Sequence, residues 1–548
     1  MLEVWTQRRE DDGMTSSTGS LVGDLLRPEA YGRDATAIIT LHTTHASWVF
    51  LAGDDVWKVK RPVEFGFLDF RTVEARRRAC EEEVRLNRRL APDVYLGVEP
   101  IRETPAGHAL GAEGPIVDWA VHMRRLPDDA SARALLARGE LDAQALEEVA
   151  GVLADFFAKA EPTPLLGTRS ALVANLEENF AQVTPFVGDL VDLETLEQVR
   201  DFQRARLSQR RAQFMRRIAD RRICEGHGDL RLDHVYFLPG ADGGRRIVII
   251  DCIEFNERFR CGDVAADVAF FAMELEAARH PDLAAGFLAR FAEASGDFGL
   301  YGVLDFYLSY RAWVRGKVAA FLAADPTSSL GVQTDARDRA RVLFGLARSY
   351  SGAPVDRPFL IAVGGVIGSG KSTLANALGR ELAVPAISSD RVRKAAAGIT
   401  PTTRADAHVY DREHRDHVYA ELARHAADVL DSGRGVILDA TFAHSDWRQL
   451  AAKTAAARNA DFVFIESTCA DRELLRQRLY ARRGGVSISD ATDELLSSFL
   501  RDYQPIATGD PGPRFTVDTS TTLEDALRVA MGMLSKSGIL PAVKRRAS

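Results

Sequence analysis

Cysteine is scarce in this sequence, and the cysteine patterns of disulfide frameworks and zinc sites are missing. The 548 residues include five cysteines, none of them in a C-x-x-C pair: Cys80, Cys224, Cys252, Cys261 and Cys469. Small exported domains and structural zinc sites depend on paired cysteines. This composition argues against both and favours a reducing compartment, the cytoplasm.

Long apolar runs and an excess of basic charge are also missing. No stretch reaches the roughly 18 apolar residues of a membrane span, and residues 1–13 carry both charge signs without an apolar segment. The 70 Lys and Arg against 78 Asp and Glu leave a net charge of −8. Because no global field attracts nucleic acid or anionic membrane, we expect neither as a partner.

The length predicts several domains, since one domain averages about 150 residues. Hydrophobic residues at 46% and charged residues at 27% are ordinary for a globular protein. The predicted divisions are a loose or helical start (1–34), a first domain (35–350, with lobes 35–125 and 126–350), a second domain (356–537) and a tail (538–548).

A phosphate-binding motif organises the second domain. The apolar run Phe359–Val363 is followed by G-x-x-x-x-G-K-S and a helical segment from Thr373 to Leu382. Glycine lets backbone N–H groups approach phosphate oxygens closely, and the helix N-terminus adds a positive dipole. The predicted nucleotide-binding residues are Gly365, Gly368, Ser369, Gly370, Lys371, Ser372 and Thr373, with Lys371 on the β- and γ-phosphates and Ser372 on Mg²⁺.

Strand-like and helical segments alternate throughout this domain, which predicts a parallel sheet covered on both faces. The expected strands are 359–363, 386–388, 435–438, 461–466 and 514–517. Ligands of such sheets gather at the carboxyl ends of the strands. Asp390 and Arg393 follow the second strand, and Asp439 ends the third in the position of a carboxylate that holds Mg²⁺ through water.

The Asp390-x-x-Arg393 pattern beside the P-loop resembles P-loop kinases of small molecules and 5′-polynucleotide ends, including zeta-toxin-like and gluconokinase-like enzymes. The resemblance implies that Asp390 is the base for the acceptor hydroxyl and that Arg393 positions acceptor or phosphate. Asp390 is also placed to cap the next helix. Farther on, the arginine-rich segment 471–485 is typical of a lid, with Arg478 and Arg482 as candidates for contact with the transferred phosphoryl group. For most of its arginines, a solvated basic helix face is the favoured interpretation.

The first domain begins with β-type segments at 37–41, 47–51 and 56–60, a helix at about 73–90, and two more strands at 95–101 and 116–123. Helices are then predicted at 144–159, 170–186 and 193–218. A hairpin (235–238 and 247–251) follows the segment His227-Gly228-Asp229-Leu230. The predicted fold class is thus an α+β, two-lobed first domain followed by an α/β P-loop domain.

His-Gly-Asp-Leu, then Ile249-Ile250-Asp251, then Gly-Asp-x-x-x-Asp at 262–267 resembles the aminoglycoside phosphotransferase family, which has a protein-kinase-like fold. The resemblance covers roughly residues 35–350. It implies that Asp229 orients or deprotonates the acceptor hydroxyl and that Asp251 ligates Mg²⁺. Asp263 and Asp267 are expected to brace the catalytic loop and cap a helix.

The same resemblance implies a strand lysine on the nucleotide phosphates and a glutamate paired with it. Lys58 and Lys60 point to one face of their strand; Lys58 is favoured, and the choice stays open. Glu83 is the candidate partner, with Glu81 and Glu82 as alternatives. His234 stands where the family usually has the asparagine of a second metal site, although imidazole is a poor ligand for Mg²⁺. Histidine at this position fits a site with a single metal ion or a site in which Asp233 is the ligand instead. It also fits a first half that binds nucleotide and transfers phosphoryl groups slowly.

Together these patterns predict a bifunctional kinase that uses ATP and Mg²⁺ at two nucleotide sites, with a small-molecule hydroxyl as phosphoryl acceptor. One alternative is a nucleotide-sensing regulator whose first half has lost its activity. The other is a 5′-polynucleotide kinase in the second half, for which a basic channel with stacking aromatics is expected. The sequence leaves the acceptor and the oligomeric state open.

Overall fold

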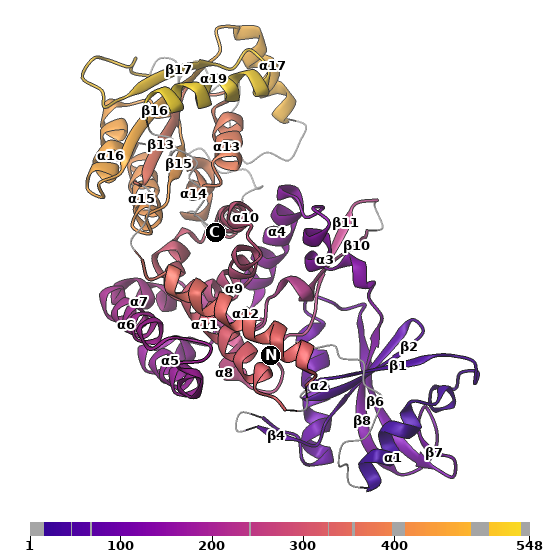
Figure 1. The fold of residues 1–548 in the computed structure, drawn as a ribbon. Coiled ribbons are helices and arrows are strands. Elements are labelled where there is room, and N and C mark those ends of the chain that lie inside the picture. Colours follow the sequence, from indigo (N-terminus) through magenta and orange to yellow (C-terminus); the bar gives the residue numbers. More distant parts are fainter. Residues whose placement is uncertain are drawn as a thin grey trace.

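The computed structural model describes residues 16–44, 46–65, 68–240, 243–326, 328–352, 357–396, 412–483 and 503–538. A sheet near the N-terminus, a helical region and a second sheet follow one another along the chain. In Figure 1 the helical region lies between the two sheets. Among the described helices, none combines the length and the apolarity needed to cross a bilayer.

The first sheet has six strands in the order β1-β2-β3-β8-β6-β7, and every neighbouring pair is antiparallel. The expected five strands are present, and one more was missed. The strands are β1 (Ile39–Thr43), β2 (Ser47–Ala52), β3 (Asp55–Lys60), β6 (Tyr95–Thr104), β7 (Gly107–Leu110) and β8 (Ile116–Arg124).

The missed strand, β7, pairs with the end of β6 through a tight turn. Thr104 Oγ1 donates to the carbonyl of Gly107 at 2.7 Å, and Gly107 has a φ of 113° that suits glycine. This short edge strand lacks the alternating apolar pattern by which the other strands were recognised.

One helix, α2 (Val73–Asn87), packs against the first sheet, as the sequence predicted. Thr72 caps its N-terminus by accepting a hydrogen bond from the Ala75 N–H. The buried face of α2 carries Cys80 and Val84, which pack with Val121 of β8. Glu83 lies on the same face and is fully buried. A small hairpin, β4 (Glu64–Phe65) with β5 (Leu68–Asp69), and the helix α1 (Ser16–Leu25) complete this part.

The central region is mostly helical and surrounds two small antiparallel pairs. The pairs are β9 (Ile223–Glu225) with β12 (Cys261–Asp263), and β10 (Val235–Pro239) with β11 (Arg245–Ile249). The helix expected over 193–218 is interrupted at Arg210 and forms two helices, α6 and α7. The helices are α3 (Ala132–Ala137), α4 (Ala143–Lys159), α5 (Arg169–Val183), α6 (Leu193–Gln209), α7 (Arg211–Ala219), α8 (Glu257–Arg260), α9 (Val264–Ala277), α10 (Pro281–Ser295), α11 (Tyr301–Ala323) and α12 (Leu330–Ser349).

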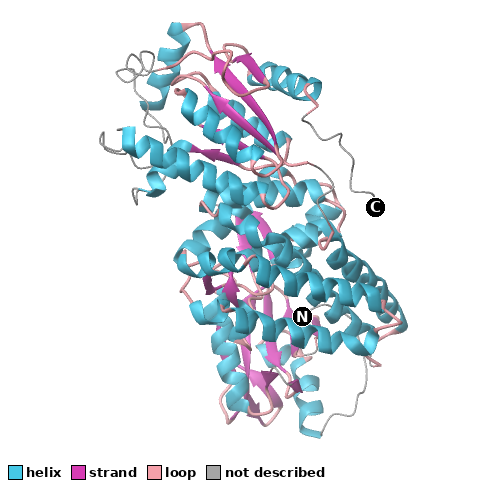
Figure 2. Ribbon diagram, turned by 90° about the vertical axis from the view of Figure 1, so that its left-hand side faces the viewer, coloured by secondary structure: helices cyan, strands magenta, loops and turns pink. Residues whose placement is uncertain are grey.

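The second sheet is entirely parallel, with the order β14-β15-β13-β16-β17, which confirms the expected architecture. Figure 2 shows helices on both of its faces. The strands are β13 (Phe359–Gly364), β14 (Ala386–Ser388), β15 (Val436–Asp439), β16 (Asp461–Thr468) and β17 (Arg514–Asp518). The helices are α13 (Lys371–Glu381), α14 (Ser389–Ala396), α15 (Arg412–Leu430), α16 (Ser445–Ala456), α17 (Arg472–Arg483) and α19 (Leu523–Lys536).

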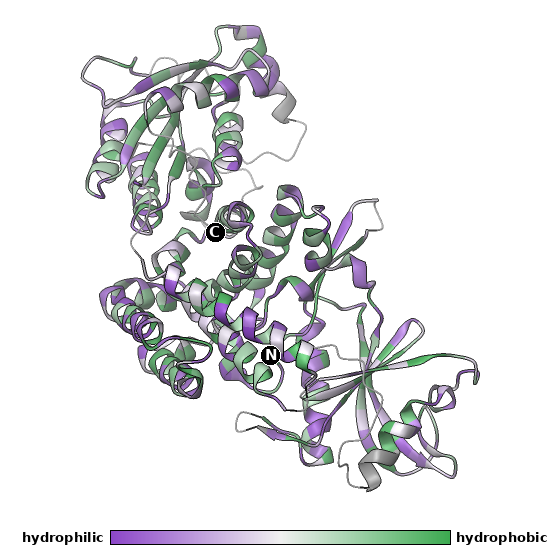
Figure 3. Cartoon of the chain, in the orientation of Figure 1, coloured by the Kyte–Doolittle hydropathy of each residue, from purple (hydrophilic) through white to green (hydrophobic). Residues whose placement is uncertain are grey.

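Alternate residues of the central strand β13 serve the two faces of this sheet. Ile361 and Val363 pack toward α13 and α19, whereas Leu360 and Ala362 belong to the opposite cluster with residues of α15 and α16. Every residue of β13 is buried, and the strands of this sheet are mostly green in the hydropathy colouring of Figure 3. Burial on both faces explains the continuous apolar sequence of this strand.

The helical region and the second sheet share one continuous apolar core. A single cluster of buried side chains includes Phe291 and Trp313 of the helical region as well as Leu360 and Phe464 of the sheet. Polar contacts cross the same boundary. For example, Glu293 Oε1 accepts a hydrogen bond from the Ala386 N–H at 2.6 Å. The two halves are therefore packed against each other as well as linked by the chain.

Candidate active sites

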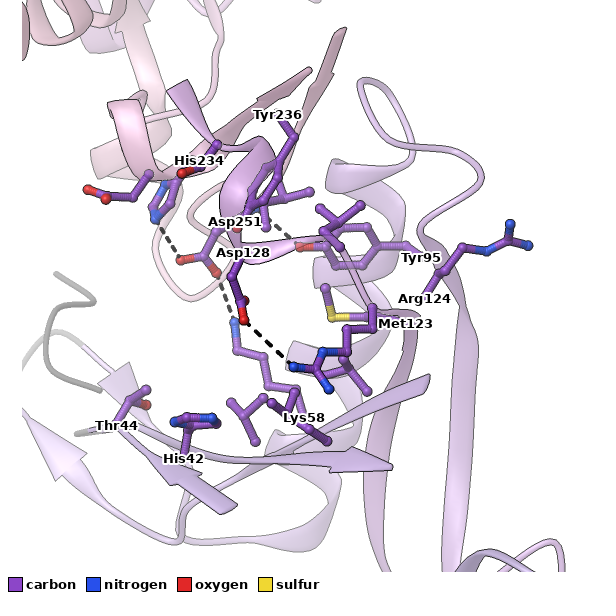
Figure 4. Close-up of a pocket in the computed structure, with 18 of the residues that line it drawn as sticks. His42, Thr44, Lys58, Tyr95, Met123, Arg124, Asp128, His234, Tyr236 and Asp251 are labelled. Carbon is purple, nitrogen blue, oxygen red and sulfur yellow. Dashed lines mark hydrogen bonds and ion pairs between the residues drawn. The ribbon is translucent and has the colours of Figure 1, made fainter. Parts of the chain in front are cut away.

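A cavity of about 570 Å³ opens between the first sheet and the loops of the helical region. Lys58 and Tyr95 line it from the sheet side, and His234 and Asp251 line it from the opposite side. Figure 4 shows these side chains converging on the cavity. The volume is that of a pocket for a small molecule. It brings together residues that are almost 200 positions apart.

Lys58 links the two walls of this cavity. Its Nζ donates to Glu83 Oε1 at 2.8 Å and to Asp251 Oδ1 at 2.9 Å. Burial alone would lower the pKa of Lys58, but the carboxylates of Asp251 and Glu83 raise it well above its ordinary value. Lys58 is therefore a fixed positive charge beside an acidic group.

Lys60 also reaches Glu83, from the other side. Its Nζ is 2.5 Å from Glu83 Oε2 and forms a second hydrogen bond with Glu254. Only 1% of its side chain is exposed, and it does not line the cavity. Of the two candidate lysines, Lys58 faces the cavity and Lys60 lies behind it. Both share the predicted glutamate partner.

Asp251 is held in an uncommon backbone conformation by the first sheet and α2. Its φ of 65° lies in the left-handed region, which a non-glycine residue adopts at some cost. Its N–H donates to the Tyr95 hydroxyl at 3.2 Å, and the next N–H, of Cys252, donates to Asn87 Oδ1 at 2.9 Å. Burial would raise the pKa of Asp251, but the ammonium group of Lys58 holds it well below its ordinary value. The result is an ionised carboxylate aimed into the cavity.

The loop that carries Asp229 is braced by Asp267, as the sequence predicted. The Asp267 carboxylate accepts hydrogen bonds from the N–H groups of His227 and Gly228 at 2.7 and 3.0 Å. Arg311 contacts both Asp267, at 3.1 Å, and the carbonyl of Gly228, at 3.0 Å. Asp263 caps α9 through the Ala265 N–H and pairs with buried Arg217. These two aspartates hold the fold of the loop.

His227 connects this loop to the segment that ends in Asp251. Its Nε2 lies 2.9 Å from the carbonyl of Ile250, and the Asp229 N–H donates to its Nδ1 at 3.3 Å. Burial lowers the pKa of His227 to about 4, so the ring is neutral near pH 7. This neutral tautomer fixes the spacing between the two acidic segments.

Asp229 lies within a buried positive environment. Its Oδ2 is 3.2 Å from Arg231 Nε and 3.6 Å from His234 Nδ1. Burial would raise its pKa, but surrounding positive charges, Arg231 and Arg315 among them, lower it well below its ordinary value. One ligand atom from each of Asp229, His234 and Asp251 lies within 4.8 Å of the others.

His234 takes part in this cluster as a hydrogen-bonding group. Its Nδ1 is 2.9 Å from the Asp229 carbonyl, and its Nε2 is 2.7 Å from an Arg231 guanidinium nitrogen. An arginine is only a donor, so the Nε2 lone pair faces Arg231 and the Nδ1–H points to the carbonyl. Asp233, the alternative ligand, forms a two-pronged ion pair with Arg133 at 2.9 and 3.0 Å. The carboxylates of Asp229 and Asp251 remain as hard oxygen donors suited to Mg²⁺.

The P-loop of the second half lies between β13 and α13, where the motif predicts it. Gly365, Gly368 and Gly370 have φ angles of 140°, 81° and 83°. A Cβ on Gly365 would lie 2.3 Å from the carbonyl oxygen of Ser467. Glycine is therefore required at Gly365 by both conformation and space. Lys371 begins α13, so the backbone N–H groups of Lys371, Ser372 and Thr373 are at the helix N-terminus.

Two neighbouring strands brace this loop. The hydroxyl of Ser467, in β16, donates to the carbonyl of Ser369 at 2.7 Å, and the hydroxyl of Thr519, just after β17, donates to the same carbonyl. Arg478 of α17 contacts the Gly368 carbonyl at 3.4 Å and the Thr519 carbonyl at 2.6 Å. Arg478 thus contacts the P-loop backbone, and its predicted contact with a transferred phosphoryl group stays a prediction. Arg482 lies in the same helix, but its side chain is outside the described part.

The acidic candidates of this half lie at the carboxyl edge of the sheet. Strand register pairs Asp439 with both Val363 of β13 and Ser388 of β14. Asp390 follows Ser388 directly, at the start of α14. Asp439 is buried, and Asp390 forms an ion pair with Arg393 one turn later. A hollow of about 300 Å³ lies beside Gly370 and Thr373, against Leu523 and Ala526 of α19.

Several residues at these sites were not singled out by the motifs. Glu254 and Tyr95 hold Lys60 and Asp251 in the first half, and Ser467 and Thr519 brace the P-loop in the second. The two P-loop braces lie at or beyond the carboxyl ends of parallel strands, which is a usable signal. Glu254 and Tyr95 belong to no short motif, and only the fold brings them to the site.

Comparisons with known proteins define the class of this chain. Residues 56–314 match the family described as "Phosphotransferase enzyme family", and residues 360–506 match the one described as "AAA domain". The chain is therefore a phosphotransferase-type protein with a kinase-like first domain and a P-loop second domain. These matches support ATP-dependent phosphoryl transfer.

The chain belongs to the same family as a group of mycobacterial proteins. It is 33% identical over 468 residues to the uncharacterized protein Rv2004c of Mycobacterium tuberculosis (strain ATCC 25618 / H37Rv), and equally to the uncharacterized protein Mb2027c of Mycobacterium bovis. The alignments cover 84% of this chain and 89% of each relative. The similarity therefore extends over parts of both domains of this chain.

Solved structures that are similar to part of this chain include a gluconokinase and an APS kinase. A gluconokinase from Sinorhizobium meliloti 1021 is 21% identical, covers 33% of this chain and 93% of its own, and has a TM-score of 0.25. The APS kinase CysC of Mycobacterium tuberculosis, in complex with AMPPNP and APS, is 20% identical, covers 33% of this chain and 98% of its own, and has a TM-score of 0.25.

Proposed function

We propose that this protein is a bifunctional kinase in which each half transfers a phosphoryl group from ATP to the hydroxyl of a small molecule. The observation that carries the proposal is the pairing of two separate constellations in one chain. One is the Lys58, Glu83 and Asp251 cluster in its cavity. The other is the glycine loop at the start of α13, beside the carboxyl edge of a parallel sheet.

In the first half, the sheet and the helical region act as the two lobes of a protein-kinase-like domain. The nucleotide lies in the 570 Å³ cavity between them, with its phosphates on Lys58. Glu83 fixes the lysine, and Lys60 with Glu254 fixes the glutamate in turn. Asp229 orients the acceptor hydroxyl and accepts its proton. Its low pKa keeps it ionised across the neutral range, so that it can accept a hydrogen bond from the acceptor hydroxyl.

A magnesium ion fits this half through Asp251, with Asp229 near enough to share in its coordination. When bound, the ion neutralises charge on the phosphate oxygens. His234 holds the loop geometry through Asp229 and Arg231 and is not needed as a ligand. A site with one metal is therefore the arrangement that these side chains favour.

In the second half, the P-loop N–H groups and Lys371 bind the β- and γ-phosphates. The hollow beside Thr373 and α19 is large enough for the nucleoside part. Ser372 and Asp439 hold the magnesium ion, Asp390 receives the acceptor proton, and Arg393 positions Asp390 or the acceptor. Arg478 of α17 donates to the Gly368 carbonyl of the loop, and we assign it to the charge that develops during transfer.

A second candidate function is a nucleotide-sensing regulator whose first half binds ATP without efficient transfer. The contact of Arg231 with His234 favours it, because a guanidinium occupies the place beside the residue that would hold a second metal. The two functions differ in whether Asp229 contributes to a chemical step.

The test is transfer of label from γ-labelled ATP to a metabolite extract by the full-length protein. We expect labelled small molecules, with one set lost in Asp229→Asn and a different set lost in Lys371→Ala. Asp129→Asn and Lys453→Ala, at exposed positions of the same halves, are matched controls and should retain both sets. Nucleotide binding without any label dependent on Asp229 would support the regulator, and label on oligonucleotide ends would overturn the small-molecule acceptor.

A further inference from the structure

A second kind of cavity lies between the two halves, away from both proposed active sites. It has a volume of about 480 Å³, within the range of ligand pockets. Phe359, Pro385 and Gly435 line it at the amino ends of β13, β14 and β15. The P-loop follows the carboxyl end of β13, so this cavity is at the opposite edge of the sheet.

The helical region supplies the other wall, which is rich in arginine. Arg206 comes from the last turn of α6 and Arg210 from the residue that ends this helix, whereas Tyr301 and Asp305 come from the start of α11. A smaller hollow, lined by several of the same residues, adjoins it. Because residues of both halves line this cavity, a molecule bound here would contact both at once.

Two of the arginines that line this cavity form no ion pair with a carboxylate of the described residues. Among the described residues, neither Arg206 nor Arg210 has a carboxylate oxygen within ion-pair distance, and Arg210 instead donates to the backbone carbonyl of Asp431 at 3.0 Å. The other charged lining groups are paired: Arg434 with Asp305 at 3.0 Å, Asp431 with Arg458 at 3.1 Å, and Arg357 with Asp461 at 2.9 Å.

Arg206 lies in the last turn of α6, and Arg210, four positions later, is the residue at which this helix ends, so their like charges repel each other. Burial and the charge of Arg210 lower the pKa of Arg206, with Asp305 acting against them. Arg206 also lies over the ring of Phe202, 5.1 Å from its centroid, which orients the guanidinium. The C-terminal helix dipole favours basic residues at this end, but it does not account for a cavity between the two halves that both arginines line.

We propose that this cavity binds the phosphate monoester of a small metabolite, with the phosphate held by Arg206 and Arg210. Guanidinium groups bind phosphate through paired N–H donors, and two of them match its double negative charge. Leu288, Tyr301 and Tyr350 line the rest of the cavity and would contact the organic part. This assignment is independent of whether both halves transfer phosphoryl groups.

Calorimetric titration of the full-length protein tests the proposal, with both nucleotide sites first saturated by Mg²⁺ and AMPPNP. The probes are inorganic phosphate, ribose 5-phosphate and AMP, with acetate at equal ionic strength as the anion control. We expect saturable binding of a phosphate probe, one molecule per chain, and none of acetate. Tighter binding of AMP than of ribose 5-phosphate would identify a nucleotide as the source of the phosphate; the reverse would identify a sugar phosphate.

Single substitutions test whether the phosphate probe binds at Arg206 and Arg210. Arg206→Gln and Arg210→Gln should each weaken it about tenfold or more, since each removes a charged hydrogen-bond donor. Arg204→Gln is the matched control, because Arg204 is on the same helix and pairs with Glu177 at 2.6 Å; it should bind like the unaltered protein. A thermal unfolding midpoint close to that of Arg204→Gln shows that each variant is folded. Because Arg206→Gln and Arg210→Gln change different residues, agreement between them supports a shared phosphate site.

Two results would overturn the proposal. One is the absence of saturable binding of all three phosphate probes up to about 10 mM, which corresponds to an affinity too weak for a built site. The other is binding that is as tight in Arg206→Gln and Arg210→Gln as in Arg204→Gln.

Discussion

The two proposed nucleotide sites of this chain differ in the chemical groups that form them. The first is built from charged side chains that neutralise one another: Lys58, Lys60, Glu83, Asp251 and Glu254. The second is built from backbone, with three glycines at positive φ and a helix N-terminus. The first needs three distant segments of the chain to meet, whereas the second is almost complete within nine consecutive residues. A site of the first kind depends on the whole fold, and one of the second kind on local conformation.

The largest expected effect is a difference in phosphoryl transfer between variants of Lys58 and variants of Lys60, the two lysines of the first site. Lys58→Met should lower transfer by the first half about 10²-fold to 10³-fold, because it removes a charge that faces the proposed phosphates. Lys60→Met should lower it less than about tenfold, yet destabilise the fold by about 3 kcal/mol or more, since it leaves Glu254 buried without its lysine. Labelled-ATP transfer and urea unfolding measure the two effects. Equal losses of transfer in both variants would contradict the division of roles.

The next effect concerns the boundary between the halves. His425 of α15 packs against Phe298, with 5.2 Å between ring centroids, and burial lowers its pKa to about 4. An unfolded histidine titrates near 6.5. The unfolded state therefore binds the proton more tightly, and stability that is complete above about pH 6.5 is lost as the pH falls toward 4. The loss should reach about 3 kcal/mol.

Urea unfolding across this pH range measures that loss. His425→Gln should flatten the pH dependence between pH 4 and 6.5. His417→Gln is the control, because His417 lies on the same helix and is exposed, and it should keep the slope of the unaltered protein. An unchanged slope in His425→Gln would show that other groups control acid stability.

A smaller effect tests the backbone character of the second site. Gly365→Ala should weaken nucleotide binding by the second half about tenfold or more, because the new Cβ would lie 2.3 Å from the Ser467 carbonyl at a φ of 140°. Gly532→Ala is the matched control: it lies within α19, its added Cβ would have no atom within 4 Å beyond the adjacent backbone of the helix, and it should raise stability by about 0.5 to 1 kcal/mol. Titration with ADP measures the first effect and thermal unfolding the second. Normal ADP affinity in Gly365→Ala would mean that the loop adopts another conformation when it binds.

This contrast also explains how much the sequence could predict. The P-loop, its parallel sheet and the loop of Asp229 follow from contiguous motifs and from burial patterns, and the structure has them at the predicted places. The choice between Lys58 and Lys60 could not be made, because both point to the same face and only the position of the cavity distinguishes them. Glu254 and Tyr95 carry no local pattern at all. The edge strand β7 and the break of the helix at Arg210 were missed because neither interrupts an apolar repeat clearly.

The apolar core shared by the two halves has a consequence during synthesis. Residues up to about 350 are synthesised before the second sheet. The apolar surface of the helical region that later packs against α15 and β13 is therefore exposed to solvent during synthesis. If the first 350 residues are expressed alone, this apolar surface stays exposed, and we expect an aggregation-prone, poorly soluble polypeptide.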